Sequence, residues 1–205
     1  MLFFERATIE EHEVEHGPLP HQRVNAAFLI LLICMLLPLP FSGLTAQAEL
    51  AAGAVLAVIL ARAIAFDLAY LILPNVYVVP LIFTGLFMPD LLGWHSWVES
   101  LYGAGVGLLL PLFFVLAMEK LFGLRAGMGG GDIKMLCAVG AWLGPVYFFV
   151  ALIIANLFAL ILAFTPKHNT TFIPFGPGIG LALWVVILFK NDIQHLLNTI
   201  TLPTF

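Results

Sequence analysis

The sequence predicts an all-α protein, a polytopic membrane bundle with about seven hydrophobic spans. Hydrophobic residues make up 62% of its 205 residues and charged residues only 10%. The mean hydropathy of +1.07 lies well outside the range of water-soluble domains. Its apolar runs are long and continuous, unlike the short alternating strands of membrane barrels. Helices are therefore expected, because lipid requires every backbone polar group to be paired internally.

Residues 1–23 are predicted to form a polar cytoplasmic arm in front of the membrane domain. A metal-binding or pH-sensing tail is the alternative, but compositional tracts are weak evidence for a site, and a solvated arm is favoured. The acidic character of this segment, and the length of the apolar run after it, argue against a signal peptide. Its interleaved acids and histidines are Glu10, Glu11, His12, Glu13, Glu15, His16 and His21.

Residues 24–190 are predicted to form the membrane domain, divided into spans by proline, glycine and aromatic residues. A helix needs about 20 apolar residues to cross the hydrocarbon. Trp94 and Trp97 separate the third and fourth spans, as is typical of residues at the headgroup level. The first four predicted spans are 24–41, 48–66, 76–92 and 98–118.

A short apolar segment, 133–143, follows the fourth span. At 1.5 Å per residue it is roughly 16 Å long and can cross only part of a bilayer. Gly144-Pro145 is predicted to break it from a full span at 146–165. The last span ends near Phe189, and the tail at 191–205 is mildly amphipathic, which favours a position on the membrane surface.

The distribution of basic residues predicts the orientation. If the chain crosses the membrane seven times, alternate loops lie on opposite sides, and seven of the eight lysines and arginines fall on the same side of the membrane. By the positive-inside rule that side is cytoplasmic. Lys190 is the one exception. Asp67 and Asp132 both fall at the cytoplasmic face.

Asp67 and Asp132 are the strongest candidates for chemistry. A carboxylate at or within the bilayer is costly, so a chain that keeps one there usually has a use for it. Asp132 ends a glycine-rich turn, 127–131, whose backbone can approach a partner closely. Two structural alternatives remain open. Asp67 could be a solvated carboxylate at a helix end, and Asp132 could be a helix N-cap.

Two carboxyl groups on one side of a membrane can act as a pair. Like charges held a few ångströms apart do not both ionise readily, so such a pair shares a proton. The ionised member can take a proton from water while the other donates one to a carbonyl oxygen, which hydrolyses a peptide without a covalent intermediate. No serine, cysteine or histidine has the spacing of a nucleophile or zinc motif. We expect no cofactor and no metal, so cleavage should persist after chelation.

Four motifs resemble those of the type IV prepilin peptidases, which are GxGD-type aspartic membrane proteases. Each motif is modest alone, but they occur in the family's order and cover most of 48–189. They are Asp67 followed after six residues by Pro74-Asn75, then Gly129-Gly130-Gly131-Asp132-Ile133-Lys134, then Gly140-Ala141-Trp142-Leu143-Gly144, and lastly Ile173-Pro174-Phe175-Gly176-Pro177.

The resemblance implies a multi-pass protein of the bacterial inner membrane that removes the short basic leader peptide from prepilins or pseudopilins at the cytoplasmic face. Its partners would be these substrates and membrane lipid, with no nucleic acid. Asp67 and Asp132 would be the catalytic pair. The supporting motif residues would be Pro74, Asn75, Gly129, Gly131, Lys134, Pro174 and Gly176.

The sequence departs from larger members of that family, which carry a cytoplasmic domain with paired cysteines and methylate the new N-terminus. It resembles the short, peptidase-only form found with tight-adherence pili. Presenilin and signal-peptide-peptidase proteins also use GxGD, but their Tyr-Asp and Pro-Ala-Leu motifs are missing from this sequence. Two alternatives remain: a proton-coupled transporter that uses the same aspartates, and a catalytically inactive bundle. The inactive-bundle alternative is motivated by residues 68–73, which carry no charge.

Overall fold

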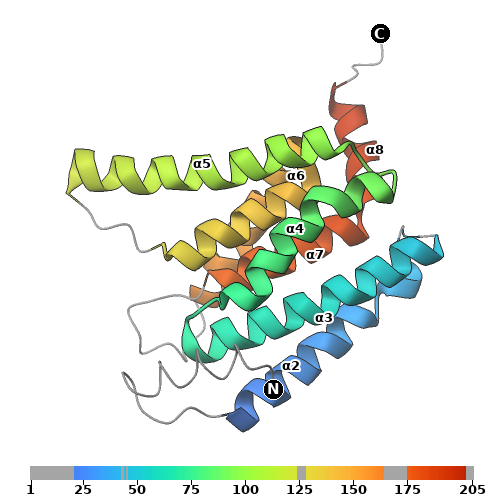
Figure 1. Cartoon of the computed structure of the whole chain (residues 1–205), viewed down its shortest axis with the longest axis horizontal. Coiled ribbons are helices and arrows are strands. Elements are labelled where there is room, and N and C mark those ends of the chain that lie inside the picture. Colours follow the sequence, from blue (N-terminus) through green and yellow to red (C-terminus); the bar gives the residue numbers. More distant parts are fainter. Residues whose placement is uncertain (1–20, 43, 45, 124–127, 164–174, 202–205) are drawn as a thin grey trace.

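The structure, a computed structural model, describes residues 21–42, 44, 46–123, 128–163 and 175–201. Every regular element among these residues is a helix (Figure 1), so the predicted all-α bundle is confirmed. Residues 1–20 of the predicted polar arm lie outside the described part. In chain order the elements are α2 (His21–Leu36), the short 3-10 helix η1 (Leu39–Phe41), α3 (Gln47–Tyr70), α4 (Asn75–Leu91), α5 (Trp97–Phe122), α6 (Gly130–Ala163), α7 (Gly176–Leu188) and α8 (Lys190–Thr201).

Three of the described helices, α3, α5 and α6, are long and apolar enough to cross a membrane, α6 only when its two halves on either side of Gly144 are counted together. The bent pair of α7 and α8, with 78° between its helices, would make a fourth if it is one broken span. α2 and α4 are apolar but shorter. The multi-pass character of the chain follows from these helices, and the number of about seven spans stays a prediction.

α3 carries Asp67 and extends one turn beyond its predicted end. The predicted end at Phe66 is wrong because the helix runs on to Tyr70. Pro74 restrains only the residue directly before it, so nothing between Phe66 and Tyr70 stops the helix. Leu71 ends α3 in the left-handed conformation, at φ 55° and ψ 32°. As a result Asp67 lies inside the last turn of α3.

α5 and α6 meet at their glycines. A Cβ added at Gly103 would overlap the carbonyl oxygen of Gly140, and one added at Gly107 would overlap that of Leu136. Small residues allow two membrane helices to approach at backbone distance. Figure 1 shows α5 and the first half of α6 close together near their labels and diverging towards the left of the view.

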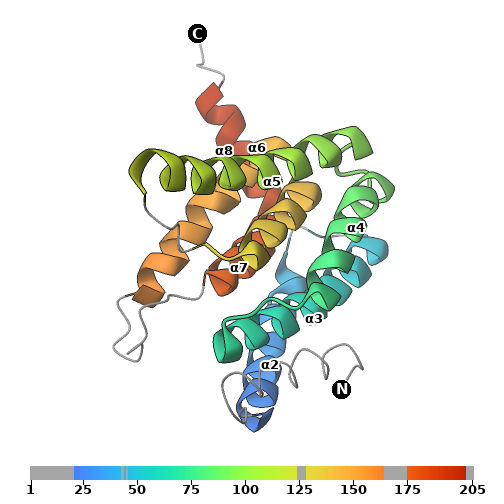
Figure 2. The ribbon, with the colours of Figure 1, turned by 60° about the vertical axis from the view of Figure 1, so that its left-hand side comes forward.

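α6 consists of two halves, separated at the predicted break. Gly144 has φ 70° and ψ 175°, which is not helical, and Pro145 follows it. Figure 2 shows the halves as two rods, the first yellow and the second orange. Leu136 and Leu152 lie equally far along the chain on either side of Gly144 and line the same pocket. The second half therefore runs back beside the first.

The end of the bundle opposite Asp67 is held by Trp94, in the loop between α4 and α5. Its indole N–H donates to Glu49 Oε1 over 2.7 Å. Lys190 Nζ lies 4.8 Å from the centroid of the Trp94 ring and donates to the Trp94 carbonyl oxygen at 3.5 Å. Lys190, the exception in the charge distribution, thus has defined partners. Glu49 and Asp67 occupy opposite ends of α3, about 27 Å apart along its axis.

Candidate active site

Asp67 is buried in the last turn of α3. Its side chain is only 4% exposed, and its Oδ2 atom has no hydrogen-bond partner among the described residues. An unpaired buried carboxylate oxygen is costly, so such a group in a native structure needs an explanation. The interpretation of Asp67 as a solvated carboxylate at a helix end does not fit this position.

Gly176, the first residue of α7, packs directly on the Asp67 carboxylate. A Cβ added at Gly176 would lie 2.5 Å from Asp67 Oδ2 and 2.9 Å from its carboxyl carbon. Glycine is therefore required at this position, because any side chain would displace the carboxylate. The beginning of α7 thus forms one wall of the space around Asp67.

Asp132 occupies the first turn of α6. The Gly129 carbonyl oxygen accepts the first backbone hydrogen bonds of this helix, from the N–H groups of Asp132 and Ile133. The Asp132 carboxylate reaches back and accepts from the Gly129 N–H over 3.3 Å. The N-cap interpretation is therefore wrong in position: Gly129 is the N-cap, and Asp132 is the third residue of the helix, where an acid can satisfy the N-cap N–H.

The structure brings Asp67 and Asp132 to the same end of the bundle. Their carboxylates lie close enough for their charges to interact. Leu73, in the loop between α3 and α4, packs between the start of α6 and the start of α7. A Cβ added at Gly131 would be 3.0 Å from Leu73 Cβ, and one added at Gly176 would be 3.1 Å from Leu73 Cδ1. The two glycines thus let the loop after Asp67 approach both α6 and α7.

Lys134 and Asn75 connect the two aspartate motifs. Lys134 Nζ donates to Asn75 Oδ1 over 3.0 Å, on the exposed side of the site. Pro74, whose extended conformation of φ −62° and ψ 134° precedes the first helical residue, sets where α4 begins. Pro174 lies outside the described residues. Of the other predicted support residues, Gly129 and Gly176 contact the two carboxylates, Gly131 contacts Leu73, and Asn75 and Lys134 join the two motifs.

Three aromatic rings pack together at the end of α3 and the start of α4, next to Asp67 in the sequence, and the sequence pattern did not indicate this cluster. The Phe66 ring lies 5.0 Å from that of Tyr70 and 6.0 Å from that of Tyr77, measured between centroids. Both tyrosines are buried. Helical spacing after Phe66 could have indicated Tyr70, whereas Leu73 and Tyr77 have no comparable sequence signal.

No three His, Cys, Asp or Glu side chains gather in the described part of the chain as a metal site would require. Asp67 and Asp132 can provide paired carboxyl chemistry: Asp67 is buried against the start of α7, and Asp132 is a half-exposed acid at the start of α6. Such a pair suits proton transfer to and from a water molecule and a carbonyl group.

Comparison with known proteins places this arrangement in a family. A model described as the type IV leader peptidase family matches residues 54–164, which include Asp67 and Asp132. The prepilin leader peptidase/N-methyltransferase of Aeromonas salmonicida strain A449 is 31% identical over 134 residues, covering 63% of this chain and 46% of the relative. The corresponding protein of Stutzerimonas stutzeri is 34% identical over 132 residues, which cover 62% of this chain and 45% of the relative. That of Pseudomonas aeruginosa is 33% identical over 134 residues, which cover 63% of this chain and 46% of the relative.

The chain spans about half the length of the curated relatives it matches. No solved structure matches it. Since the family model covers more than half of the chain and both candidate acids, the chain belongs to the type IV leader peptidase family.

Proposed function

We propose that the protein is an aspartic endopeptidase that removes the short basic leader peptide from prepilins or pseudopilins at the cytoplasmic face of the bacterial inner membrane. The observation that carries the proposal is the position of Asp67. Its carboxylate is buried, has one oxygen unpaired among the described residues, and lies within electrostatic reach of Asp132. Family membership, with relatives named prepilin leader peptidases, supports the choice of substrate.

In the proposed reaction the two carboxyl groups share one proton. The ionised one takes a proton from a water molecule, whose oxygen forms a bond to the carbonyl carbon of the scissile peptide. The protonated one donates to the carbonyl oxygen, which gives a tetrahedral intermediate. As the C–N bond breaks, the acid that took the proton from water donates it to the leaving nitrogen, and the other acid takes back a hydroxyl proton, so the leader leaves as a carboxylic acid and both acids return to their starting state. Gly176 would hold Asp67 in place, and Gly129 would hold Asp132 through its N–H group.

The orientation in the membrane rests on charge. Lys134, beside the candidate site, belongs to the basic set that the positive-inside rule assigns to the cytoplasm. Trp94 lies at the other end of α3, where it bonds to Glu49, about 27 Å from Asp67 along the helix axis. This separation is close to the thickness of the hydrocarbon layer, and tryptophan is typical of the headgroup layer. Labelling of engineered cysteines tests this: a cysteine at Ser96 should react from outside, and one at Lys167 should not.

The proposal is tested by cleavage of a substrate with a basic leader, a glycine and an apolar helix. Wild-type protein purified in detergent should cut after the glycine. Asp67→Asn and Asp132→Asn should each lose cleavage while still inserting in the membrane, because one carboxyl group cannot act as both acid and base. Full cleavage by either variant contradicts the mechanism. No cleavage by folded wild type contradicts the assigned substrate class.

A further inference from the structure

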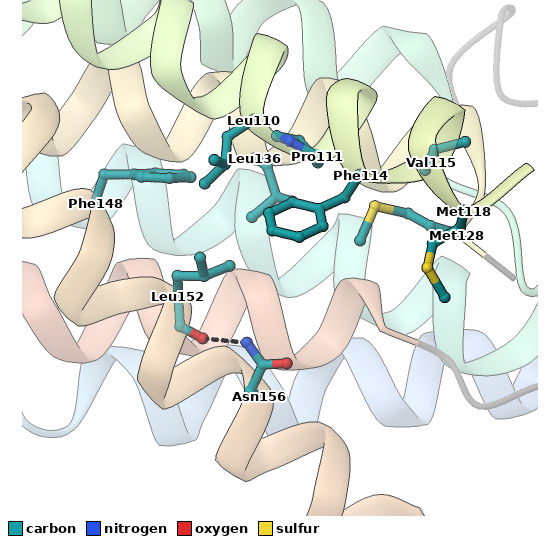
Figure 3. A pocket seen from close by; sticks show the side chains of 10 residues that line it. All are labelled: Leu110, Pro111, Phe114, Val115, Met118, Met128, Leu136, Phe148, Leu152 and Asn156. Carbon is teal, nitrogen blue, oxygen red and sulfur yellow. Dashed lines mark hydrogen bonds between the residues drawn. The ribbon is translucent and has the colours of Figure 1, made fainter. Parts of the chain in front are cut away.

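An apolar pocket of about 370 Å³ lies between α5 and the two halves of α6 (Figure 3). Phe114 and Met118 line it from α5, and Leu136 and Leu152 from the two halves of α6. Met128, in the glycine-rich turn before Asp132, closes one side. This volume falls in the range of sites that bind small molecules or inserted side chains.

The pocket follows from the way α5 and α6 cross. Gly103 and Gly107 hold α5 at backbone distance from the first half of α6. Beyond Gly107 the larger side chains of α5 face a diverging α6, so the space between the helices widens towards Met118 and Met128. The wide end lies beside the candidate active site, since Leu136 is one helical turn after Asp132 on the same face of α6.

Asn156 is the polar side chain in this otherwise apolar lining. Its Nδ2 donates to the Leu152 carbonyl oxygen over 2.7 Å (Figure 3), and this is its one partner among the described residues. The Oδ1 acceptor and the second N–H remain available. An amide in an apolar membrane helix is costly, and such side chains commonly bond to a neighbouring helix. Asn156 therefore indicates a polypeptide occupant more than a lipid chain, which could not use the amide.

We propose that this pocket binds side chains of the apolar substrate helix that follows the scissile bond, with Asn156 as a polar contact. This inference rests on the proposed function. A substrate cut at Asp67 and Asp132 must begin its apolar helix within a few residues of them, and the pocket opens there. Met118 and Met128, unbranched and adaptable, suit substrates whose apolar side chains differ.

Photo-cross-linking tests this with a matched pair of neighbouring phenylalanines. Phe114 lines the pocket, whereas Phe113 does not, and both are largely exposed, at 59% and 67%. Benzoylphenylalanine replaces one or the other in the full chain carrying Asp132→Asn, reconstituted in phosphatidylcholine vesicles with the leader-glycine-helix substrate. If the chain with Asp132→Asn does not accumulate in the membrane, Asp67→Asn replaces that substitution. The probe at 114 should label the substrate at least tenfold more than the probe at 113. Labelling of lipid alone from both positions, or of a second copy of the chain from 114, overturns the proposal.

A kinetic measurement on otherwise wild-type protein separates this inference from the proposed function. Asn156→Leu should raise KM about threefold, the size of an average hydrogen bond between membrane helices, with kcat unchanged and partial recovery in Asn156→Gln. The control Leu157→Ile, at a 55% exposed position outside the lining, should change neither constant. Normal cleavage with an unchanged KM and no label from 114 overturns only the pocket assignment. Absence of cleavage by folded wild type contradicts the proposed function itself.

Discussion

Lys134 Nζ lies 3.0 Å from Asn75 Oδ1, and this hydrogen bond joins the two segments that carry the candidate catalytic acids. Asn75 is the first residue of α4, and Lys134 lies in the first turns of α6. The bond therefore links the starts of two helices. A shift of either start would move Leu73 or Asp132, and with them the spacing of the two carboxylates.

The first prediction concerns this bond. A typical hydrogen bond contributes about 1 kcal/mol net, and exposure to solvent keeps this lysine–amide bond near that value, so Asn75→Leu and Lys134→Met should each lower kcat/KM roughly three- to tenfold. The double variant should be no worse than either single one, because each removes the same contact. A double-mutant cycle measures this coupling, with Lys120→Met, at the end of α5, as a control for the loss of an exposed lysine charge. Losses that multiply in the double variant would show that the two residues act independently.

The second prediction concerns the wall formed by Gly176. Gly176→Ala would place a methyl group 2.5 Å from Asp67 Oδ2, so the carboxylate must move. A displacement of about 1 Å at a reacting group can cost on the order of a hundredfold in rate, and cleavage should fall by about that factor. Gly105→Ala is the matched control, since a Cβ there has no neighbour within 4 Å. Undiminished cleavage by Gly176→Ala would remove Asp67 from the proposed mechanism.

The sequence was sufficient for the fold class and for the main helix breaks, because these depend on local chemistry. Continuous apolar runs predict membrane helices, and Pro74 and Gly144-Pro145 act on their own backbone. Three of the five residues of the third motif have a packing or backbone role. Gly140 meets Gly103, Trp142 Nε1 donates to the Leu81 carbonyl oxygen at 3.0 Å, and Gly144 turns the chain. The catalytic role of Asp67 and Asp132 stays a proposal.

What the sequence could not predict depends on contacts between distant segments. The burial of Asp67 depends on α7, and no local pattern shows that Gly176 would face it. The position at which α3 ends depends on Leu71, which adopts the left-handed conformation that leucine seldom does. The pocket between α5 and α6 likewise depends on where Gly103 meets Gly140, which is a property of packing and not of either helix alone.

The third prediction concerns that glycine contact. Gly103→Ala or Gly140→Ala would force the backbones of α5 and α6 apart, and overpacking of this kind typically costs about 1–3 kcal/mol. The unfolding temperature in detergent should fall for both variants. Gly105→Ala, on the open side of the same helix, should leave it unchanged or slightly raised, because alanine favours a helix over glycine. Equal unfolding temperatures for the variants at 103 and 105 would contradict the close approach of the two helices.

The fourth prediction is a pH dependence of stability that arises from His95, in the loop between α4 and α5. Its Nε2 lies 3.0 Å from Ser100 Oγ. Burial, and next the charge of Lys190, lower the pKa of His95 below its usual 6.5, although Glu99 and Asp90 act in the opposite direction. As pH falls through about 6.5 the unfolded chain binds a proton that the folded chain does not, so stability is lost. The stability that His95 contributes is therefore present above this pH and decreases below it.

The unfolding temperature of wild type should consequently fall more between pH 7.5 and pH 5 than that of His95→Gln, whose neutral amide cannot titrate. Differential scanning fluorimetry in one detergent at both pH values gives the four temperatures, and the carboxylates common to both proteins cancel in the comparison. Equal decreases in the two proteins would show that His95 takes up its proton as readily in the folded chain as in the unfolded one. The contact with Ser100 would then not depend on a neutral imidazole.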